Sequence, residues 1–387
     1  MSVTGPAGFI AGGHACGIKG SGDADLAIVA TASGRAVPAA GVFTSNKATA
    51  APVEVSRSHL AATEGRAAAV VLSSGNANAA TGAAGRADAE RMCALTAAGL
   101  TCAVEEVLVC STGLIGIPLP MDRLEEGIPA AAGRLRSDGG GAAAEAIRTT
   151  DTVRKEVLIE GDGFSVGGMA KGAAMLAPNM ATMLAVLTTD AEATTAELQE
   201  ALAAGVETSF NVLSTDGCTS TNDTVLLLAS GEAGPVDPAE LHIAVGEACA
   251  SLARQMAGDA EGATKVVTVQ VIGAATDGDA AAAARQVADS NLCKCSWYGQ
   301  DPYWGRVVSE VGASGAAFDQ DLVSVSYGGI TVCRSGVAAM HDVSALQRAM
   351  AERELHLVVD LGLGDGAGVI LTNDLTHAYV DENMGTS

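Results

Sequence analysis

The stretch "GMAKGAAMLAPNMATMLAVLTTDA", residues 168–191, has one hydroxyl where an aliphatic side chain is expected. Thr182 follows Ala181 and lies between Met180 and Met183 in an apolar run. A threonine in such a run is usually a core residue whose hydroxyl bonds to the backbone. It can also be an acyl-accepting nucleophile, provided that a base removes its proton. The pattern alone leaves both interpretations open.

A threonine at a new chain terminus would carry its own base. The α-amine has a reference pKa of about 7.7 to 8, so it can accept the hydroxyl proton near neutral pH. In an intact chain the Ala181–Thr182 bond would first be cut from within: the Thr182 Oγ attacks the Ala181 carbonyl, an ester forms, and water opens it. The small side chain of Ala181 would permit that crowded attack.

Composition and charge narrow the class of protein. The 387 residues suffice for two or three domains or one large layered unit. Apolar residues make up 48% but aromatic residues only 3%, so the core must consist of Ala, Val, Leu and Met. The net charge of −23 argues against a nucleic-acid or membrane-surface partner. An anionic substrate would need a local cation, for which Lys171, Arg154, Lys155 and Arg306 are candidates.

Cysteine and histidine spacing predict no metal site. The nine cysteines lack C-x-x-C spacing, and Cys293 and Cys295 alone cannot supply a tetrahedral zinc site, so we expect reduced thiols. Six scattered histidines weaken any Ser-His or Cys-His hydrolase hypothesis. No cationic leader and no apolar run of roughly 20 residues is present, so the sequence predicts a soluble, cytoplasmic protein.

Strand and helix signals arrive in mixed order, which favours an α+β fold over a regular βαβ winding. The segment "GLGDGAG" (362–368) resembles a dinucleotide motif, but a strand pattern follows it where a helix would be needed. We expect a buried strand within 66–82 that ends in a loop of small polar residues, and a second one within 105–120 that ends in a Ser-Thr-Gly turn and a proline-punctuated exit. Hairpins are expected at 155–172, 322–334 and 355–374, a strand at 265–274, and helices at 86–98, 195–208, 237–257, 279–290 and 302–312.

One block closely resembles a known family. The run "KGAAMLAPNMATML" (171–184), followed by "TTDA", is similar to the self-cleavage region of the ornithine acetyltransferases, the glutamate N-acetyltransferases of the cyclic arginine pathway. The resemblance covers almost the whole chain. Further blocks occur in the family's order: "SGNANAATG" (74–82), "STGLIG" (111–116), "TTDT" (149–152), "STDGCTSTNDT" (214–224), "AEGATK" (260–265), "GQDPYWGR" (299–306) and "DLGLGDG" (360–366).

The resemblance implies a fold and a division of the chain. The family has an αββα-type sandwich similar to that of N-terminal-nucleophile hydrolases, with a smaller C-terminal α/β lobe, here roughly 285–365. Cleavage would give an α-chain of 1–181 and a β-chain of 182–387. Two such αβ units are expected to associate as an α2β2 heterotetramer.

The resemblance also implies roles for particular residues. Thr182 would be both the cleavage residue and the acetyl-accepting nucleophile, and Thr112 and Gly113 would form the oxyanion hole. Lys171 would meet a substrate carboxylate, and Glu261 would face the amino group or assist its proton transfers. The remaining substrate contacts carry over onto Thr149, Thr182 and the C-terminal Asn383 and Ser387.

The implied chemistry is a ping-pong transfer. N-acetylornithine acylates Thr182, ornithine leaves, and glutamate takes the acetyl group. No metal and no organic cofactor is needed, and acetyl-CoA is a second acetyl donor in bifunctional members.

Departures from the family pattern leave alternatives open. Tyr303, Cys218 and the short tail from Asn383 to Ser387 differ from the usual residues and put substrate selection in question. A paralogue acting on another amine, or an amidohydrolase or aminopeptidase that passes the acyl group to water, would use the same Thr182. A catalytically silent binding protein would keep the fold and an intact chain.

Overall fold

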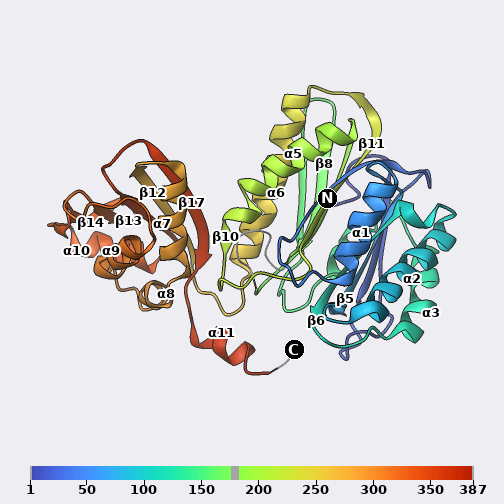
Figure 1. Cartoon of the computed structure of the whole chain (residues 1–387), viewed down its shortest axis with the longest axis horizontal. Helices are drawn as coiled ribbons and strands as arrows, with labels where there is room; N and C mark the ends of the chain where they lie inside the picture. Colours follow the sequence, from blue (N-terminus) through green and yellow to red (C-terminus); the bar gives the residue numbers. More distant parts are fainter. Residues whose placement is uncertain (1, 176–182, 386–387) are drawn as a thin grey trace. The chain divides into compact units, whose positions relative to one another are not determined.

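The computed structural model describes residues 2–175 and 183–385, which form two compact units (Figure 1). The first unit comprises the described residues up to Asn211 together with Thr219–Met256. The second comprises Val212–Cys218 and Ala257–Gly385. A chain of this length is expected to divide in this way, because single cores stop growing at roughly 250 to 300 residues.

Two β-sheets face each other in the first unit. Apolar side chains of both sheets form one core, in which Ala27, Val70 and Leu108 come from one sheet and Val186 and Leu226 from the other. The first sheet has the order β1 (Phe9–His14), β2 (Leu26–Thr31), β5 (Ala69–Asn76), β6 (Val107–Leu114). The second has the order β4 (Arg66–Ala67), β3 (Val37–Phe43), β11 (Thr224–Pro235), β9 (Leu184–Glu192), β8 (Ser165–Lys171), β7 (Lys155–Glu160).

Helices cover the outer face of each sheet (Figure 1). On the first sheet Met92 and Leu124 pack against Ile28 and Val109 in a second core. Its helices are α1 (Ala51–Ala62), α2 (Gly82–Leu100) and α3 (Met121–Ala132), with a 3-10 turn at Val104–Glu106. On the second sheet α5 (Thr195–Glu207) contacts β3 and β11, and α6 (Pro238–Gly258) packs on β8. The short α4 (Gly140–Ala146) adds alanines to the core between the sheets. The expected αββα sandwich is therefore confirmed.

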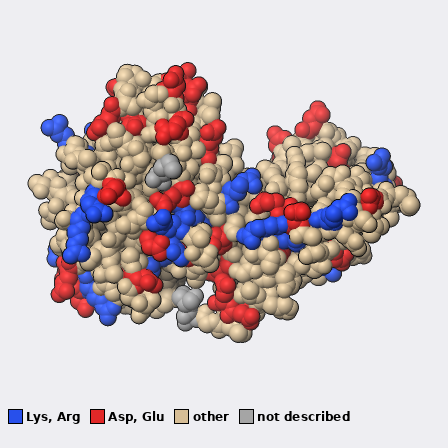
Figure 2. Space-filling model, turned by 180° about the vertical axis from the view of Figure 1, so that it is seen from behind, with Lys and Arg blue, Asp and Glu red and all other residues tan. Residues whose placement is uncertain are grey.

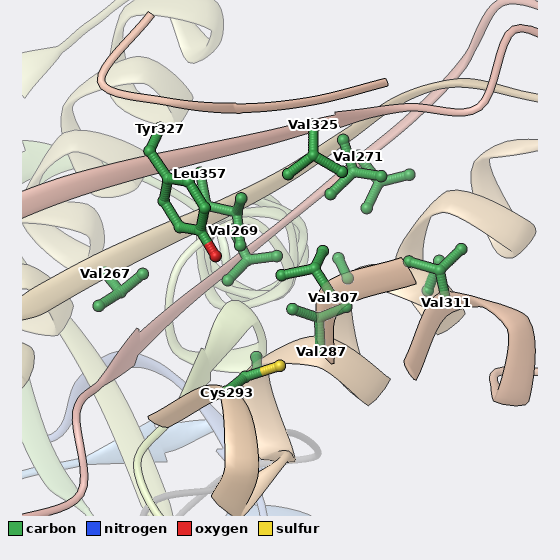
Figure 3. Packing of buried hydrophobic residues seen from close by; sticks show 14 of the residues in the cluster. Val267, Val269, Val271, Val287, Cys293, Val307, Val311, Val325, Tyr327 and Leu357 are labelled. Atoms are coloured by element: carbon green, nitrogen blue, oxygen red, sulfur yellow. The ribbon is translucent and has the colours of Figure 1, made fainter. Parts of the chain in front are cut away.

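The second unit is built on one mixed sheet. Figure 3 shows Val269 and Val271 of β12 packing against Val287 and Val307, which come from two helices. The strand order is β10 (Leu213–Ser214), β17 (Gly366–Asn373), β12 (Val266–Ala274), β16 (Glu354–Asp360), β13 (Ser324–Tyr327), β14 (Ile330–Arg334), β15 (Val337–Ala338). The helices are α7 (Asp277–Asp289), α8 (Asn291–Tyr298), α9 (Trp304–Ala313), α10 (Val343–Ala351) and α11 (His377–Glu382), and a 3-10 turn at Phe210–Val212 precedes β10. The unit is wider than residues 285–365, since β12 and β17 lie outside that range.

Two expectations about local structure are wrong. The segment 355–374 is no hairpin, because β12 lies between β16 and β17 and pairs with both. The Ser-Thr-Gly sequence is no turn, because Thr112 and Gly113 belong to β6 and pair with β5 in parallel register. In each case a strand from elsewhere in the chain supplies the hydrogen-bond partners that local sequence cannot reveal. The hairpins β7–β8 and β13–β14 are confirmed.

The charged surface and the state of the cysteines can be compared with what the composition predicts. Figure 2 shows lysine and arginine side chains beside acidic ones on the face that it presents. All nine cysteines are free. Within residues 2–175 and 183–385, no His, Cys, Asp and Glu side chains cluster as metal ligands would. Over the same ranges no helix has the length and apolar character needed to cross a membrane.

Candidate active site

The end of strand β6 approaches its neighbour β5 unusually closely. Gly113 has a φ of 128°, a conformation that side chains other than glycine rarely adopt. A Cβ at Gly113 would lie 2.3 Å from the carbonyl carbon of Gly75. Glycine is therefore required here by backbone conformation and by space, and its peptide is held rigidly at the strand end.

Thr112, the preceding residue, contacts a buried lysine. Lys171 ends β8, is 3% exposed, and donates from Nζ to the Thr112 Oγ1 at 3.2 Å. A hydroxyl that accepts a hydrogen bond still has its own hydrogen to donate. The ammonium polarises that O–H group, so Thr112 is suited to donate to a developing oxyanion.

Asp151 joins several of these residues. Its Oδ1 accepts from the Lys155 Nζ and from the Gly172 N, both at 2.7 Å. Its Oδ2 accepts from the Thr149 N at 3.1 Å and lies 4.0 Å from the Lys171 Nζ. Burial opposes ionisation, but the charges of Lys171 and Lys155 hold the pKa of Asp151 below its usual range. The carboxyl is thus an anion between two buried cations.

A second buried carboxyl holds the residue that follows Thr182. Ala181 and Thr182 themselves lie outside the described residues. The Met183 N donates to the Asp223 Oδ1 at 2.9 Å, and the Thr224 N donates to the Met183 O at 3.2 Å. The Asp223 Oδ2 has no hydrogen-bond partner among the residues that the structure describes. Burial raises the pKa of Asp223 well above its ordinary value, which favours the neutral acid.

Strand pairing fixes where the chain re-enters the sheet. Leu184 pairs with Lys171 of β8 on one side and with Thr224 of β11 on the other. A cavity of about 40 Å³ is lined, among others, by Thr112, Gly113, Met175 and Asn222. The first unit therefore brings four expected site residues together: Thr112, Gly113, Thr149 and Lys171.

Two further expected residues meet in the second unit. The Asn383 Nδ2 donates to the Glu261 Oε2 at 2.8 Å and to the Tyr379 O at 2.9 Å. Glu261 is 9% exposed and lines a cavity of about 260 Å³ together with Tyr379 and Lys294. This acidic cavity, to which Asp216 and Asp374 also belong, is suited to a substrate amine. The last expected contact, Ser387, lies outside the described residues.

Cys218 and Tyr303, which depart from the family pattern, both belong to the second unit. Cys218 is exposed at the end of the 212–218 segment. Tyr303 is 54% exposed, and the Arg306 guanidinium lies 5.8 Å from its ring centroid. Arg306 also donates to the Leu292 O, so this candidate cation serves the local structure of the second unit.

The sequence predicts no role for Asp151 or Asp223, and it indicates Lys155 only as a candidate cation. Both aspartates occur in blocks quoted above, "TTDT" and "STDGCTSTNDT". Neither follows a helical or strand periodicity, and short polar blocks of this kind usually form loops. A buried charge that contacts residues far away in sequence becomes apparent only in the folded chain.

The family model and the sequences of curated relatives match almost the whole chain. The model of the ArgJ family matches residues 10–385. The arginine biosynthesis bifunctional protein ArgJ of Thermobifida fusca is 48% identical, with both chains covered completely. The protein of the same name from Mycobacterium tuberculosis strain H37Rv is 49% identical over 100% of this chain and 96% of that one. A crystal structure of the Mycobacterium tuberculosis ornithine acetyltransferase complexed with ornithine is 48% identical, covers 46% of this chain and 94% of that chain, and has a TM-score of 0.44.

Proposed function

The chain belongs to the ArgJ family, and we propose that it is a self-cleaving acetyltransferase of arginine biosynthesis that moves the acetyl group of N-acetylornithine to glutamate. The observation that carries this proposal is the contact of the Lys171 Nζ with the Thr112 Oγ1, beside the close approach of Gly113 to β5. The charged Lys171 polarises the Thr112 hydroxyl, which lies next to the Gly113 N–H in the sequence. Lys171 pairs with Leu184, two residues after Thr182, so these groups lie near the proposed nucleophile in the strand register.

The proposed self-cleavage converts one amide into a free amine and a carboxylate. The Thr182 Oγ attacks the Ala181 carbonyl, the amide nitrogen leaves as the α-amine of Thr182, and an ester results. Water then hydrolyses the ester, which restores the Thr182 hydroxyl and leaves a carboxylate on Ala181. The two new chains are 1–181 and 182–387.

The proposed transfer uses the same hydroxyl. The α-amine of Thr182 takes the hydroxyl proton while Oγ attacks the acetyl carbonyl of N-acetylornithine, and the proton passes to the departing ornithine amine. The Thr112 hydroxyl and the Gly113 N–H stabilise the oxyanion. The amine of glutamate then attacks the acetyl ester, and Thr182 is regenerated. Thr149, Lys171, Glu261, Asn383 and Ser387 are the proposed substrate contacts.

Cofactors, assembly and location complete the proposal. The reaction as written needs no metal and no organic cofactor, and acetyl-CoA is proposed as a second acetyl donor because the relatives are bifunctional proteins. Two αβ units are proposed to form an α2β2 heterotetramer. Nine free cysteines fit a reducing compartment, so the proposed location is the cytoplasm.

The experiment that tests the proposal compares the wild type with Thr182→Ala. Denaturing intact masses should give two fragments for the wild type, the second beginning T-M-L-A-V-L, and one uncut chain for the variant. The wild type should then form N-acetylglutamate from N-acetylornithine and glutamate. Release of ornithine without N-acetylglutamate would identify an amidohydrolase instead, and an uncut, folded wild type would refute the N-terminal nucleophile.

A further inference from the structure

The buried Asp151 carries an inference that rests on the proposed function. It is 3% exposed and is contacted by both lysines of the site, Lys155 and Lys171, which are also buried. Three ionisable groups are thus removed from water together. Buried charges are tolerated in proteins when they are paired and hydrogen-bonded.

Asp151 lies at different distances from the two lysines, and this difference indicates its role. Lys155 is its close partner at 2.7 Å, whereas the Lys171 Nζ is 4.0 Å away and donates to the Thr112 hydroxyl. Asp151 thus forms a hydrogen-bonded ion pair with Lys155 and a longer ionic contact with Lys171, and both lysines favour its ionised form. With one anion and two cations, the cluster keeps a net charge of +1, and Lys171 carries it at the oxyanion residue.

The backbone contacts of Asp151 reach the same site. Its oxygens accept from the N–H groups of Thr149 and Gly172, and Gly172 directly follows Lys171. Gly172 is also the residue at which the chain leaves β8. One carboxylate thereby fixes the position of a proposed substrate contact and the end of the strand that presents Lys171.

We propose that Asp151 is a positioning residue for acetyl transfer: it cancels the charge of Lys155, which keeps Lys171 protonated and directed at the Thr112 hydroxyl. Without this anion, Lys155 and Lys171 would be two like charges in a buried site. Like charges disfavour each other's ionised forms, so Lys171 would lose its proton more readily.

Two further titratable or charged side chains lie near the cluster, Arg148 and Asp223. The Arg148 guanidinium binds the backbone carbonyl of Asp151 rather than its carboxyl, and it pairs with Glu145. Asp223, at the start of β11, interacts electrostatically with Lys171, but its burial favours the neutral acid. Among the residues that the structure describes, Asp151 is the ionised carboxyl that lies within 4.0 Å of the Lys171 Nζ.

The test begins with Asp151→Asn, a nearly isosteric change that removes the charge and keeps one of the two oxygens that accept from the N–H groups of Gly172 and Thr149. We expect a folded, self-cleaved enzyme whose kcat/KM at neutral pH is lower by ~100-fold, the effect of impairing one oxyanion donor. The basic limb of its pH profile should move to lower pH, because removing the negative charge lowers the pKa of Lys171. A matched control is Asp190→Asn, which alters a carboxylate that accepts from the N–H groups of Ala7 and Ser165 at the other end of β9; its profile should equal that of the wild type.

The double variant Asp151→Asn with Lys155→Met distinguishes an electrostatic role from a merely structural one. It restores the net charge of +1 on Lys171, so kcat/KM should recover by at least ~10-fold over Asp151→Asn, and the basic limb should return toward that of the wild type. If Asp151→Asn does not fold, the double variant is compared directly with the wild type. The proposal then requires a kcat/KM within ~10-fold of the wild type and an unchanged pH profile.

The outcomes separate the inference from the proposed function. A wild type without acetyl transfer would refute the function. A wild type that transfers acetyl groups, with Asp151→Asn equal to it in kcat/KM and pH profile, would overturn the inference alone. A folded double variant that shows no recovery over Asp151→Asn would also overturn it, because the loss would then come from the backbone contacts and not from the charge.

Discussion

At the scale of single residues, the candidate site depends on atoms that touch at one strand end. Thr112 and Gly113 are neighbours in β6, yet they contribute differently, one through a polarised hydroxyl and the other through backbone space. Each contribution can be removed by one substitution. For each substitution, a residue of the same type elsewhere in the chain serves as the control.

Substitution of Gly113 by alanine should be severe. The residue has a φ of 128°, and the added Cβ would lie 2.3 Å from the Gly75 carbonyl carbon, so β6 must move away from β5. We expect a loss of more than about 3 kcal/mol in the free energy of unfolding, beyond the roughly 1 kcal/mol cost of a left-handed residue alone. Urea unfolding curves of the purified variant measure this loss.

The control is Gly116→Ala. Gly116 also has a positive φ, of 82°, but a Cβ there meets nothing within 4 Å. It should cost only about 1 kcal/mol. Equal losses for the two variants would contradict the argument that the close approach of β5 adds to the cost of the backbone conformation at Gly113.

Replacement of Thr112 by valine removes the hydroxyl and keeps the shape. If the polarised O–H group stabilises the oxyanion, kcat should fall by ~100-fold or more, while KM should change little because the donor acts mainly in the transition state. Steady-state kinetics with N-acetylornithine and glutamate give both constants. Thr96→Val is the matched control, since Thr96 is also fully buried and donates only to a helix carbonyl, that of Met92. An unchanged kcat in Thr112→Val would remove Thr112 from the oxyanion hole.

At the scale of helices and strands, a buried lysine stabilises the second unit. Lys294 of α8 donates from Nζ to the Thr215 O, the Thr372 Oγ1 and the Asn373 O, at 2.8, 2.6 and 2.9 Å. It thus links α8 to the segment of β10 and to β17. Burial lowers the pKa of Lys294 from 10.5 to about 8. A base whose pKa is lowered by folding makes the stability of the unit depend on pH.

The sign of this dependence follows from proton counts. Between the pKa of about 8 in the folded chain and 10.5 in the unfolded chain, the unfolded chain binds more protons, so stability rises with pH. The stability of the wild type relative to Lys294→Met should therefore grow by about 2 to 3 kcal/mol from about pH 7 to about pH 10. Urea unfolding at both pH values measures it. Lys47→Met, which alters an exposed lysine, is the control substitution and is measured in the same way.

The elements also show how far the sequence could predict the structure. Most helices and strands follow local signals: Asp237-Pro238 predicts the start of α6, and the Asp162-Gly163 turn predicts the β7–β8 hairpin. Strand partners are a different matter. The sequence of β16 and β17 carries no sign that β12, about 80 residues earlier in the chain, separates them.

The candidate site was predictable to a similar extent. Thr112, Gly113 and Lys171 come from family blocks, and the structure brings them together. Asp151 and Asp223 could not be assigned from sequence, because their roles arise from burial and from contacts across strands. Loop-like polar blocks look the same whether they end on the surface or inside the protein.

At the scale of the whole molecule, the proposed cleavage point divides one sheet. In the six-stranded sheet, β4, β3, β8 and β7 precede residue 182, whereas β11 and β9 follow it. The order β4-β3-β11-β9-β8-β7 places the two later strands between the earlier ones. Backbone hydrogen bonds thus join the α-chain to the β-chain along both edges of the β11–β9 pair.

This interleaving predicts that the cut chains do not separate while the fold persists. Native mass spectrometry of the wild type should give both fragments in one particle, and only a denaturant should release them. The part of 182–387 that belongs to the first unit should not fold alone, because it lacks β3 and β8, and its β11–β9 pair would expose two unpaired edges and an apolar face. The uncut Thr182→Ala chain is the control for the native mass, and the cleaved wild type should be heavier than its own uncut chain by one water per cleavage. Fragments that separate in native buffer without loss of secondary structure would contradict the strand order. Fragments that stay together until the sheet unfolds would show why a cut inside a domain leaves its active site assembled.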